Sequence, residues 1–404
     1  MVFAGNQMIY SADPVEAAQD GLEALKPYGT YRQRQFVDAI LLHGGVNAAA
    51  RALGIHHATV SKSIHRLRAA AAMRGHSPKH DMVHDVPNPF IVKGVSTYYN
   101  RDGVAAGQWV KSTIDQEKRY EILQELVRTL ADEVRPAAPL AYNGSCESDL
   151  LTVYPLGDPH AGLYSWKDET GSHYDLDEFE RVNIAAIDRL VSMAPPSKIA
   201  LFNNKGDLTH ADNSKNRTPR SGHALDVHGR HSQVVRIAVK VKIHCIQRLL
   251  EKHEKVIIRI DPGNHDEETA LMIAMIIEAY YRNEPRVEVI TSPNPYWYYS
   301  HGKVLIGTCH GDGAKGKDLP AIMANDVREL WGAARDCVWF VGHVHHRDEK
   351  EYRGCDVIYV NTLAAPDYYS HHAGYRSKRR MMAVTYHKER GEETRHTCNV
   401  ENFA

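Results

Sequence analysis

The spacing of apolar residues between Tyr31 and Met73 predicts a group of short helices. The first helix has one apolar face and ends at a glycine pair that begins at Gly44, and Asn47 is positioned to cap the second. A third helix is expected at Ala58–Arg68. The residues expected on the inner faces of the first and third helices are Phe36, Ile40, Leu41, Val60, Ile64 and Leu67.

Proline and glycine separate this helical region from the rest of the chain. Gly75–Pro89 is predicted to be a linker. Phe90–Val110 fits a β-hairpin with its turn beginning at Asn100. Asp115–Val134 has the periodicity of an amphipathic helix, and a second linker follows it. We therefore expect three regions, at residues 1–80, 81–147 and 148–404.

Short apolar strands alternate with helices from Leu150 onwards, which predicts an α/β domain. The helix candidates are Phe179–Val191 and Leu271–Tyr281, and a last strand is expected near Met382–Tyr386. The other strand candidates are Leu151–Leu156, Lys198–Phe202, Val256–Ile260, Val304–Thr308, Val338–Val341 and Val357–Val360.

Five of these six strands end in residue types that bind metals. In open α/β sheets, ligands bind outside the carboxyl ends of the strands, so these residues can converge on one crevice. Carboxylates and imidazoles without thiolates suit divalent ions such as manganese, iron or zinc. The five blocks are Gly157-Asp158-Pro159-His160, Gly206-Asp207-Leu208-Thr209-His210, Gly263-Asn264-His265-Asp266, His310-Gly311-Asp312 and Gly342-His343-Val344-His345.

The ordered series Asp-x-His, Gly-Asp, Gly-Asn-His-Asp, His and Gly-His-x-His resembles the calcineurin-like metallophosphoesterases over about residues 148–390. The resemblance implies a four-layer α/β/β/α sandwich. It also implies phosphoester hydrolysis with two divalent metal ions, which together can clamp a phosphate and activate a water. Manganese is the expected metal, with iron, zinc or magnesium as alternatives.

The resemblance also implies a role for each residue of these blocks. The implied ligands of the first metal are Asp158, His160, Asp207 and His345. The implied ligands of the second metal are Asp207 as the bridge, Asn264, His310 and His343. His265 would contact the phosphate or protonate the leaving oxygen, and Asp266 would orient it. The alternative for any single residue is a strand-ending turn with a chance polar side chain.

Two features favour DNA as the substrate. The block at Asp207 resembles that of the SbcD-type repair exonucleases, in which a histidine three residues further on helps to position the DNA phosphate. His210 occupies that position. A histidine at the start of a helix, without consequence for activity, is the alternative.

The second feature is Asn47–Arg68, which resembles the helix-turn-helix of LysR-type regulators and implies an N-terminal all-α DNA-binding domain. No Asp or Glu occurs between Ile40 and His80, so this region is locally basic. A three-helix module for protein contacts is the alternative. The expected DNA-contacting residues on the third helix are His57, Thr59, Ser61, Lys62, His65 and Arg66.

Other segments could contact nucleic acid as well. Asn203–Arg236 is long and polar, and it is either a clasp for a DNA backbone, a solvated loop or a dimer contact. The aromatic stretches Tyr296–Tyr299 and Pro366–Tyr369 could stack on unpaired bases, or they pack in the core. Gly311–Lys317 has the spacing of a phosphate-binding loop, but Asp318 replaces the required Ser or Thr, so the match is taken as accidental.

Composition and charge narrow the setting. The 404 residues include 49 Lys and Arg and 50 Asp and Glu, so no global charge indicates nucleic acid or a membrane, and any such patch must be local. The six cysteines are widely spaced and indicate no disulfide framework. No signal peptide or membrane span is evident, so a cytoplasmic location is expected, in the host if the chain is phage-encoded.

Little chain follows the last expected strand, where SbcD-type nucleases have a further region for DNA capping and for their ATPase partner. This departure speaks against an SbcC-type partner, and the arrangement resembles phage-encoded phosphoesterases with a helix-turn-helix. Homodimerisation is left open. The leading hypothesis is a DNA-directed two-metal phosphodiesterase, an exo- or endonuclease. The alternatives are a nucleotide or phosphoprotein phosphoesterase located by DNA binding, and a non-catalytic DNA-binding regulator.

Overall fold

The computed structural model describes residues 21–74, 86, 90–99, 105–114, 121, 136–142 and 144–403. The chain divides into two compact units, Met1–Leu123 and Gln124–Ala404. The linker expected at Gly75–Pro89 and the helix expected at Asp115–Val134 lie outside the described residues, except for one position in each. The same holds for the hairpin turn expected at Asn100.

Within the described residues of the N-terminal unit, three helices share one apolar core. They are α2 (Tyr31–His43), α3 (Val46–Ala52) and α4 (His57–Met73), preceded by the 3₁₀-helix η1 (Lys26–Tyr28). Thr30 and Gln33 form a capping box at the start of α2, and Gly44 ends it in the left-handed region at φ 78°. Because Gly45 directly precedes α3, the assignment of Asn47 as its cap is wrong.

The apolar faces predicted for α2 and α4 are confirmed. The buried residues from that prediction are Phe36, Ile40, Val60, Ile64 and Leu67, and Leu41 packs against them. β1 (Phe90–Tyr99) and β2 (Ala105–Ile114) pair antiparallel, as predicted for the hairpin, and β2 extends beyond the expected end at Val110.

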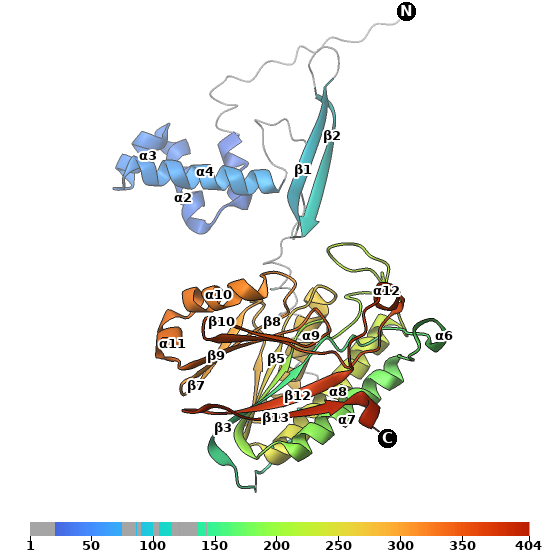
Figure 1. Ribbon diagram of the computed structural model, residues 1–404. Helices are drawn as coiled ribbons and strands as arrows, with labels where there is room; N and C mark the ends of the chain where they lie inside the picture. The colour runs from blue at the N-terminus through green and yellow to red at the C-terminus, as the bar shows by residue number, and fades with distance from the viewer. Residues whose placement is uncertain are drawn as a thin grey trace, which may run out of the picture. The chain divides into compact units, whose positions relative to one another are not determined.

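The Gln124–Ala404 unit contains two mixed β-sheets, which confirms the α/β class (Figure 1). The six-stranded sheet has the order β13-β12-β3-β4-β5-β6, and the five-stranded sheet has the order β10-β11-β9-β8-β7. The strands of the first sheet are β3 (Glu147–Leu156), β4 (Ser197–Asn204), β5 (Lys255–Ile260), β6 (Val287–Ile290), β12 (Arg380–His387) and β13 (Gly391–Asn399). The strands of the second are β7 (Trp297–His301), β8 (Val304–Cys309), β9 (Asp336–Val341), β10 (Asp348–Tyr352) and β11 (Cys355–Tyr359).

Helices cover the outer faces of both sheets. Those packed on the six-stranded sheet are α7 (Leu176–Met193), α8 (His231–Lys252) and α9 (Glu267–Tyr281), and those on the five-stranded sheet are α10 (Leu319–Asp326) and α11 (Arg328–Ala333). The short elements are α6 (Lys167–Thr170), η3 (Gly316–Asp318), α12 (Tyr368–His372) and η4 (Val400–Asn402). Within the described part of the chain, no helix is both long enough and apolar enough to cross a bilayer.

Alternation along the central strands produces two cores. In β3, Leu151 and Val153 face the core between the two sheets, whereas Tyr154 and Leu156 face the helices. A strand that is buried on both faces has a continuous run of apolar residues in its sequence. For this reason the apolar pattern predicted the bounds of β3, β4 and β5 to within a few residues.

Two sequence-based expectations need correction, and one pair of alternatives is decided. Asn203–Arg236 is not one loop, because its last residues from His231 onwards form the first turn of α8. The strand near Met382–Tyr386 is not the last, because β13 follows it. The stretch Tyr296–Tyr299 packs rather than projects: Tyr298 lies against Trp339 and its hydroxyl donates to Asp326, 2.8 Å away.

Candidate metal centre

The five metal-type blocks lie at the carboxyl ends of five parallel-paired strands, β3, β4 and β5 in one sheet and β8 and β9 in the other (Figure 1). Among the described residues, three groups have possible ligand atoms within 4.8 Å of one another. These groups are Asp158, His160, Asp207 and His345; Asp207, His310 and His343; and His160, His210 and His265. The first two groups share Asp207, so the arrangement can hold two ions next to each other.

The backbone of the ligand residues is strained. Seven non-glycine residues in the described ranges have a positive φ, and five of them are expected ligands. Those five are Asp158 (φ 38°), His160 (46°), Asp207 (47°), His343 (71°) and His345 (59°). Each such residue costs about 1–3 kcal/mol unless its surroundings enforce it, and strain of this kind clusters at functional sites.

Two glycines permit the close approach of the blocks. A Cβ on Gly263 would lie 2.1 Å from Asp207 Oδ1, and a Cβ on Gly206 would lie 2.4 Å from His310 Nδ1. Gly206 also has φ 91°, which side chains rarely adopt. The glycine before the bridging aspartate is therefore needed for both space and conformation, whereas Gly263 is needed for space.

In the first ligand group, two imidazole nitrogens lie at hydrogen-bond distance from each other, so they can share either a proton or a cation. His160 Nε2 and His345 Nε2 are 3.1 Å apart, and His345 Nε2 is 3.7 Å from Asp158 Oδ1. Two nitrogens that bind one tetrahedral ion at about 2.0–2.1 Å would be roughly 3.3 Å apart. The observed spacing fits a shared metal ion.

The second group closes around His310. Its Nε2 lies 3.4 Å from Asp207 Oδ2, 2.9 Å from Asn264 Oδ1 and 3.2 Å from His343 Nδ1. Its Nδ1 is 2.7 Å from the carbonyl oxygen of Lys205 and donates to it. This donation leaves the Nε2 lone pair free for a metal, as is usual for ligating histidines.

Burial and neighbouring charge set the protonation of these groups. Burial raises the pKa of Asp158 to about 7. Burial also acts to raise the pKa of Asp207, but the charges of His310 and His265 hold it well below its usual range. Burial lowers the pKa of His345 to about 4 and that of His160 well below its usual value. Neutral imidazoles are the form that binds metals.

His310 differs from the other histidines of the site. Burial acts to lower its pKa, but the Asp207 carboxylate raises it to about 10. Without a metal, a proton on His310 thus neutralises part of the buried negative charge. A divalent cation placed between the same atoms would replace that proton.

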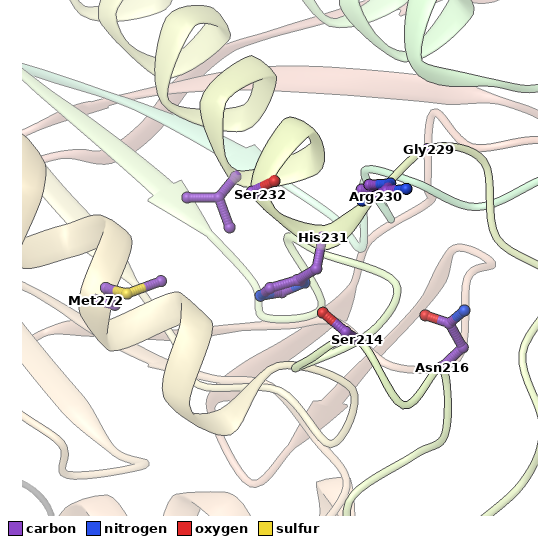
Figure 2. A pocket seen from close by; sticks show the side chains of 8 residues that line it. Ser214, Asn216, Gly229, Arg230, His231, Ser232 and Met272 are labelled. Carbon is purple, nitrogen blue, oxygen red and sulfur yellow. The ribbon is translucent and has the colours of Figure 1, made fainter.

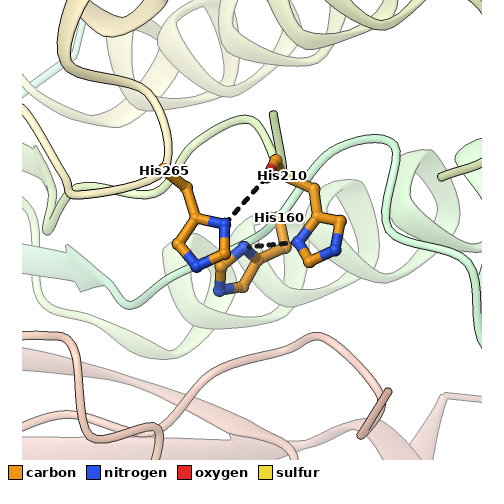
Figure 3. Close-up of side chains that lie close together, drawn as sticks. All are labelled: His160, His210 and His265. Atoms are coloured by element: carbon orange, nitrogen blue, oxygen red, sulfur yellow. Dashed lines mark hydrogen bonds between the residues drawn. The ribbon is translucent and has the colours of Figure 1, made fainter. Parts of the chain in front are cut away.

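His265 takes a different partner from the one expected. Its Nδ1 donates to the backbone carbonyl of His210, 2.8 Å away (Figure 3). Asp266, expected to orient His265, instead accepts from the backbone N–H groups of Thr209 (2.9 Å) and Gly263 (3.1 Å). Asp266 therefore joins the second and third blocks, and His265 Nε2 remains available to a ligand or substrate.

His210 lies inside the cluster, as its place after Asp207 led us to expect. It is 2% exposed, and its Nδ1 is 3.2 Å from His160 Nδ1 (Figure 3). Its Nε2 is buried and has no hydrogen-bond partner. Because a buried polar atom without a partner is costly, a ligand that bound this nitrogen would remove an unfavourable feature of the site.

A buried ion network that was not predicted from the sequence lies behind the second ligand group. Lys205 Nζ and Arg259 Nε bind opposite oxygens of Asp261, at 2.6 and 2.8 Å, and all three side chains are fully buried. Lys205 belongs to the segment Asn203–Arg236, but its buried side chain supports the strand end that carries Asp207 and cannot contact a DNA backbone. The charged Arg259 within the apolar run Val256–Ile260 was the available signal.

A separate cavity of about 760 Å³ opens at the start of α8 (Figure 2). It contains none of the expected ligands. Its lining residues are Ser214, Asn216, Gly229, Arg230, His231, Ser232, Val235 and Met272. Arg220, within the polar segment Asn203–Arg236, is paired with Glu267 and Asp312.

No protein-family model matches this sequence, and no curated protein matches it. Several solved structures resemble it at low identity. A conserved protein of Streptococcus pneumoniae, described as a predicted phosphoesterase, is 11% identical and has a TM-score of 0.24, with 63% of this chain and 99% of that one covered.

Two further structures resemble the chain in the same way. Vps29 complexed with zinc, from Entamoeba histolytica, is 13% identical with a TM-score of 0.26, and the match covers 62% of this chain and 99% of that one. A dimetal phosphatase from Danio rerio is 8% identical with a TM-score of 0.32, and the match covers 62% and 99%. At these scores the functional assignment rests on the side chains of the site.

Proposed function

We propose that the Gln124–Ala404 unit is a calcineurin-like metallophosphoesterase of the SbcD-type branch, which hydrolyses DNA phosphodiester bonds with two divalent metal ions. One observation carries the proposal: Asp207 Oδ2 lies between the two ligand groups, 3.9 Å from His160 Nε2 and 3.4 Å from His310 Nε2. A carboxylate oxygen in this position is suited to bridge two ions. Such a pair supplies Lewis acidity and a water nucleophile at neutral pH.

The chain's own residues orient the substrate and move the proton. Asp207 is held by the His265 backbone N–H, which donates to its Oδ1 over 2.9 Å. The carbonyl of His210 fixes the His265 ring, so that Nε2 can donate to a phosphoryl oxygen or to the departing oxygen. The unpartnered His210 Nε2 is a second donor for the phosphate.

Manganese is the metal we propose. The ligand set combines carboxylates, an amide oxygen and imidazoles, and none of the three clusters contains a thiolate. Such a set suits manganese, iron or zinc, and it disfavours the soft ions that select cysteine.

DNA is the proposed substrate because of the N-terminal unit, in which α3 and α4 would act as a helix-turn-helix. The inner face of α4 is buried, whereas its outer face is exposed and carries cations. The exposed residues proposed to contact DNA are His57, Thr59, Ser61, Lys62, His65 and Arg66. A helix with such a face can enter a major groove.

The test incubates the full chain with end-labelled single-stranded and duplex DNA, with manganese, magnesium or zinc. Asp207→Ala should lower the hydrolysis rate by about 10²- to 10⁴-fold, because several kcal/mol of charge stabilisation are lost. Metal content, measured on the same samples, should fall with it. Asp312→Asn is the matched control, since Asp312 follows His310 but belongs to none of the ligand groups.

Full activity in Asp207→Ala would refute the assignment of the metal centre. Intact DNA under every ion, together with hydrolysis of bis(p-nitrophenyl) phosphate, would keep the hydrolase and reject DNA as the substrate. A nucleotide or phosphoprotein would then be the substrate to test.

A further inference from the structure

Four aromatic side chains are exposed on two segments that leave the metal centre. They are Tyr164 (38% exposed), Trp166 (48%), Tyr368 (53%) and Tyr369 (71%). Large aromatic rings that gather on an exposed surface mark a binding site more often than chance exposure does. We call these four side chains the aromatic rim.

Both segments start at the first ligand group. Tyr164 and Trp166 follow His160 by four and six residues. The other segment starts at Thr362, whose hydroxyl donates to the carbonyl oxygen of Asp158 over 2.7 Å. Tyr368 is six positions after Thr362, so their Cα atoms are no more than about 20 Å apart.

A direct contact joins the two segments. The hydroxyl of Ser165 donates to the carbonyl oxygen of Pro366 over 2.7 Å, and α6 and α12 are in contact (Figure 1). Ser165 lies between Tyr164 and Trp166, and Pro366 lies two residues before Tyr368. The backbone at the four residues therefore lies close to one contact point. One face of the Tyr164 ring stacks on His228 and one face of the Tyr368 ring on His372.

The segment after α12 adds positive charge. Arg376 and Lys378 are exposed, and no ion pair joins either of them to a carboxylate within the described residues. One guanidinium nitrogen of Arg376 donates to the backbone carbonyls of His371 (3.0 Å) and Tyr375 (2.9 Å). The nearby acids are Asp367, which caps α12 by accepting from the Ser370 backbone N–H, and the exposed Asp168 and Glu169 of α6. Lys378 and the remaining N–H groups of Arg376 are thus available to a polyanion.

We infer that the aromatic rim stacks on unpaired nucleotides of the DNA strand that enters the metal centre, so that the substrate is single-stranded or locally opened DNA. This inference rests on the proposed phosphodiesterase function and narrows its substrate. Every base has a π-face, so such stacking tolerates any sequence, and neighbouring cations follow the phosphates. α4 would read a duplex, whereas the rim would receive the unpaired strand that is cut.

The test measures binding of fluorescein-labelled oligo(dT) to the full chain in chelator, by fluorescence anisotropy. The double variant Tyr368→Leu/Tyr369→Leu keeps apolar bulk and removes both π-faces. It should weaken oligo(dT) binding by about 5- to 100-fold for each lost stack. Tyr368→Phe/Tyr369→Phe keeps the rings and should bind as the wild type does. Tyr31→Leu, which removes an exposed tyrosine of the other unit, is the matched control.

Photocrosslinking with 5-iododeoxyuridine in the oligonucleotide provides a second measurement that does not depend on activity. Crosslinks mapped to the four rim residues would support the proposal. Wild-type affinity in the double leucine variant, or crosslinks confined to other residues, would overturn it. Wild-type hydrolysis of bis(p-nitrophenyl) phosphate separates the two proposals, because the hydrolase can be right when the rim is wrong.

Discussion

The metal centre and the outer face of α4 place polar side chains under opposite conditions. Asp158, Asp207 and His310 are at most 2% exposed, and the two aspartates lie on left-handed backbone. Lys62 and Arg66 are exposed on a regular helix. The buried charges of the metal centre raise the free energy of the folded state unless a cation compensates them. The exposed charges on α4 change that free energy little, whether or not a ligand is bound.

This difference predicts how each region responds to substitution. A change in the metal centre alters several neighbours, because its atoms share hydrogen bonds and charge across five blocks. A change on α4 removes one solvated side chain. Effects should therefore be large and coupled in the centre, and small and additive on the helix.

His265→Ala should give the largest effect in this comparison. Turnover should fall by about 10²- to 10⁴-fold, which is the range for loss of a positioned proton donor. Metal content should stay at the wild-type level, because neither of the two groups that share Asp207 contains His265. Both are measured by hydrolysis assay and elemental analysis, with the exposed His173→Ala as control.

Loss of metal in His265→Ala would change the role assigned to His265. It would make the cluster of His160, His210 and His265 a metal site in its own right. His265 would then be a ligand rather than a proton donor.

Asp158→Asn should stabilise the metal-free chain at pH 8. The folded pKa of Asp158 is about 7 and its ordinary value is 3.8, so the folded state holds the proton more tightly than the unfolded state does. Stability is therefore lost as pH rises from about 4 to about 7. Removing the carboxylate should recover about 1–4 kcal/mol at pH 8 and almost nothing near pH 4.

Urea unfolding in chelator at both pH values measures this difference. Addition of manganese should reverse the order, because the wild type binds the ion and the variant has lost a ligand. Equal stability of the two proteins at pH 8 would show that the buried carboxylate is already compensated without metal.

The double variant Lys62→Ala/Arg66→Ala should give the smallest effect. Duplex affinity should fall by about tenfold, and the salt dependence of binding should decrease by about two phosphate contacts. The free energy of unfolding should change by less than about 1 kcal/mol, since both side chains are exposed. Binding is followed by anisotropy at several salt concentrations, with Arg32→Ala on α2 as control.

Unchanged duplex affinity in that variant would remove α4 from the DNA surface. A three-helix module for protein contacts would then be the better description of this unit. That result would leave the assignment of the metal centre unchanged, because the side chains of the centre and those of α4 are expected to act independently.

The apolar pattern of the sequence predicted some strands and helices and missed others. β3, β4 and β5 are buried on both faces and were located from their apolar runs. β10 and β13 were missed because they lie at sheet edges and are largely polar, so no apolar pattern marks them. α8 was not among the expected helices, because its first residues continue the polar character of the segment before it.

The sequence by itself determined which residues could bind metal, because each block is a local transition from a buried strand to a polar turn. The tertiary structure decided that blocks from two different sheets meet around Asp207. It also decided that His265 binds the carbonyl of His210 while Asp266 binds two backbone N–H groups. Hydrogen-bond partners depend on which atoms come within about 3 Å, and spacing along the chain does not specify that distance.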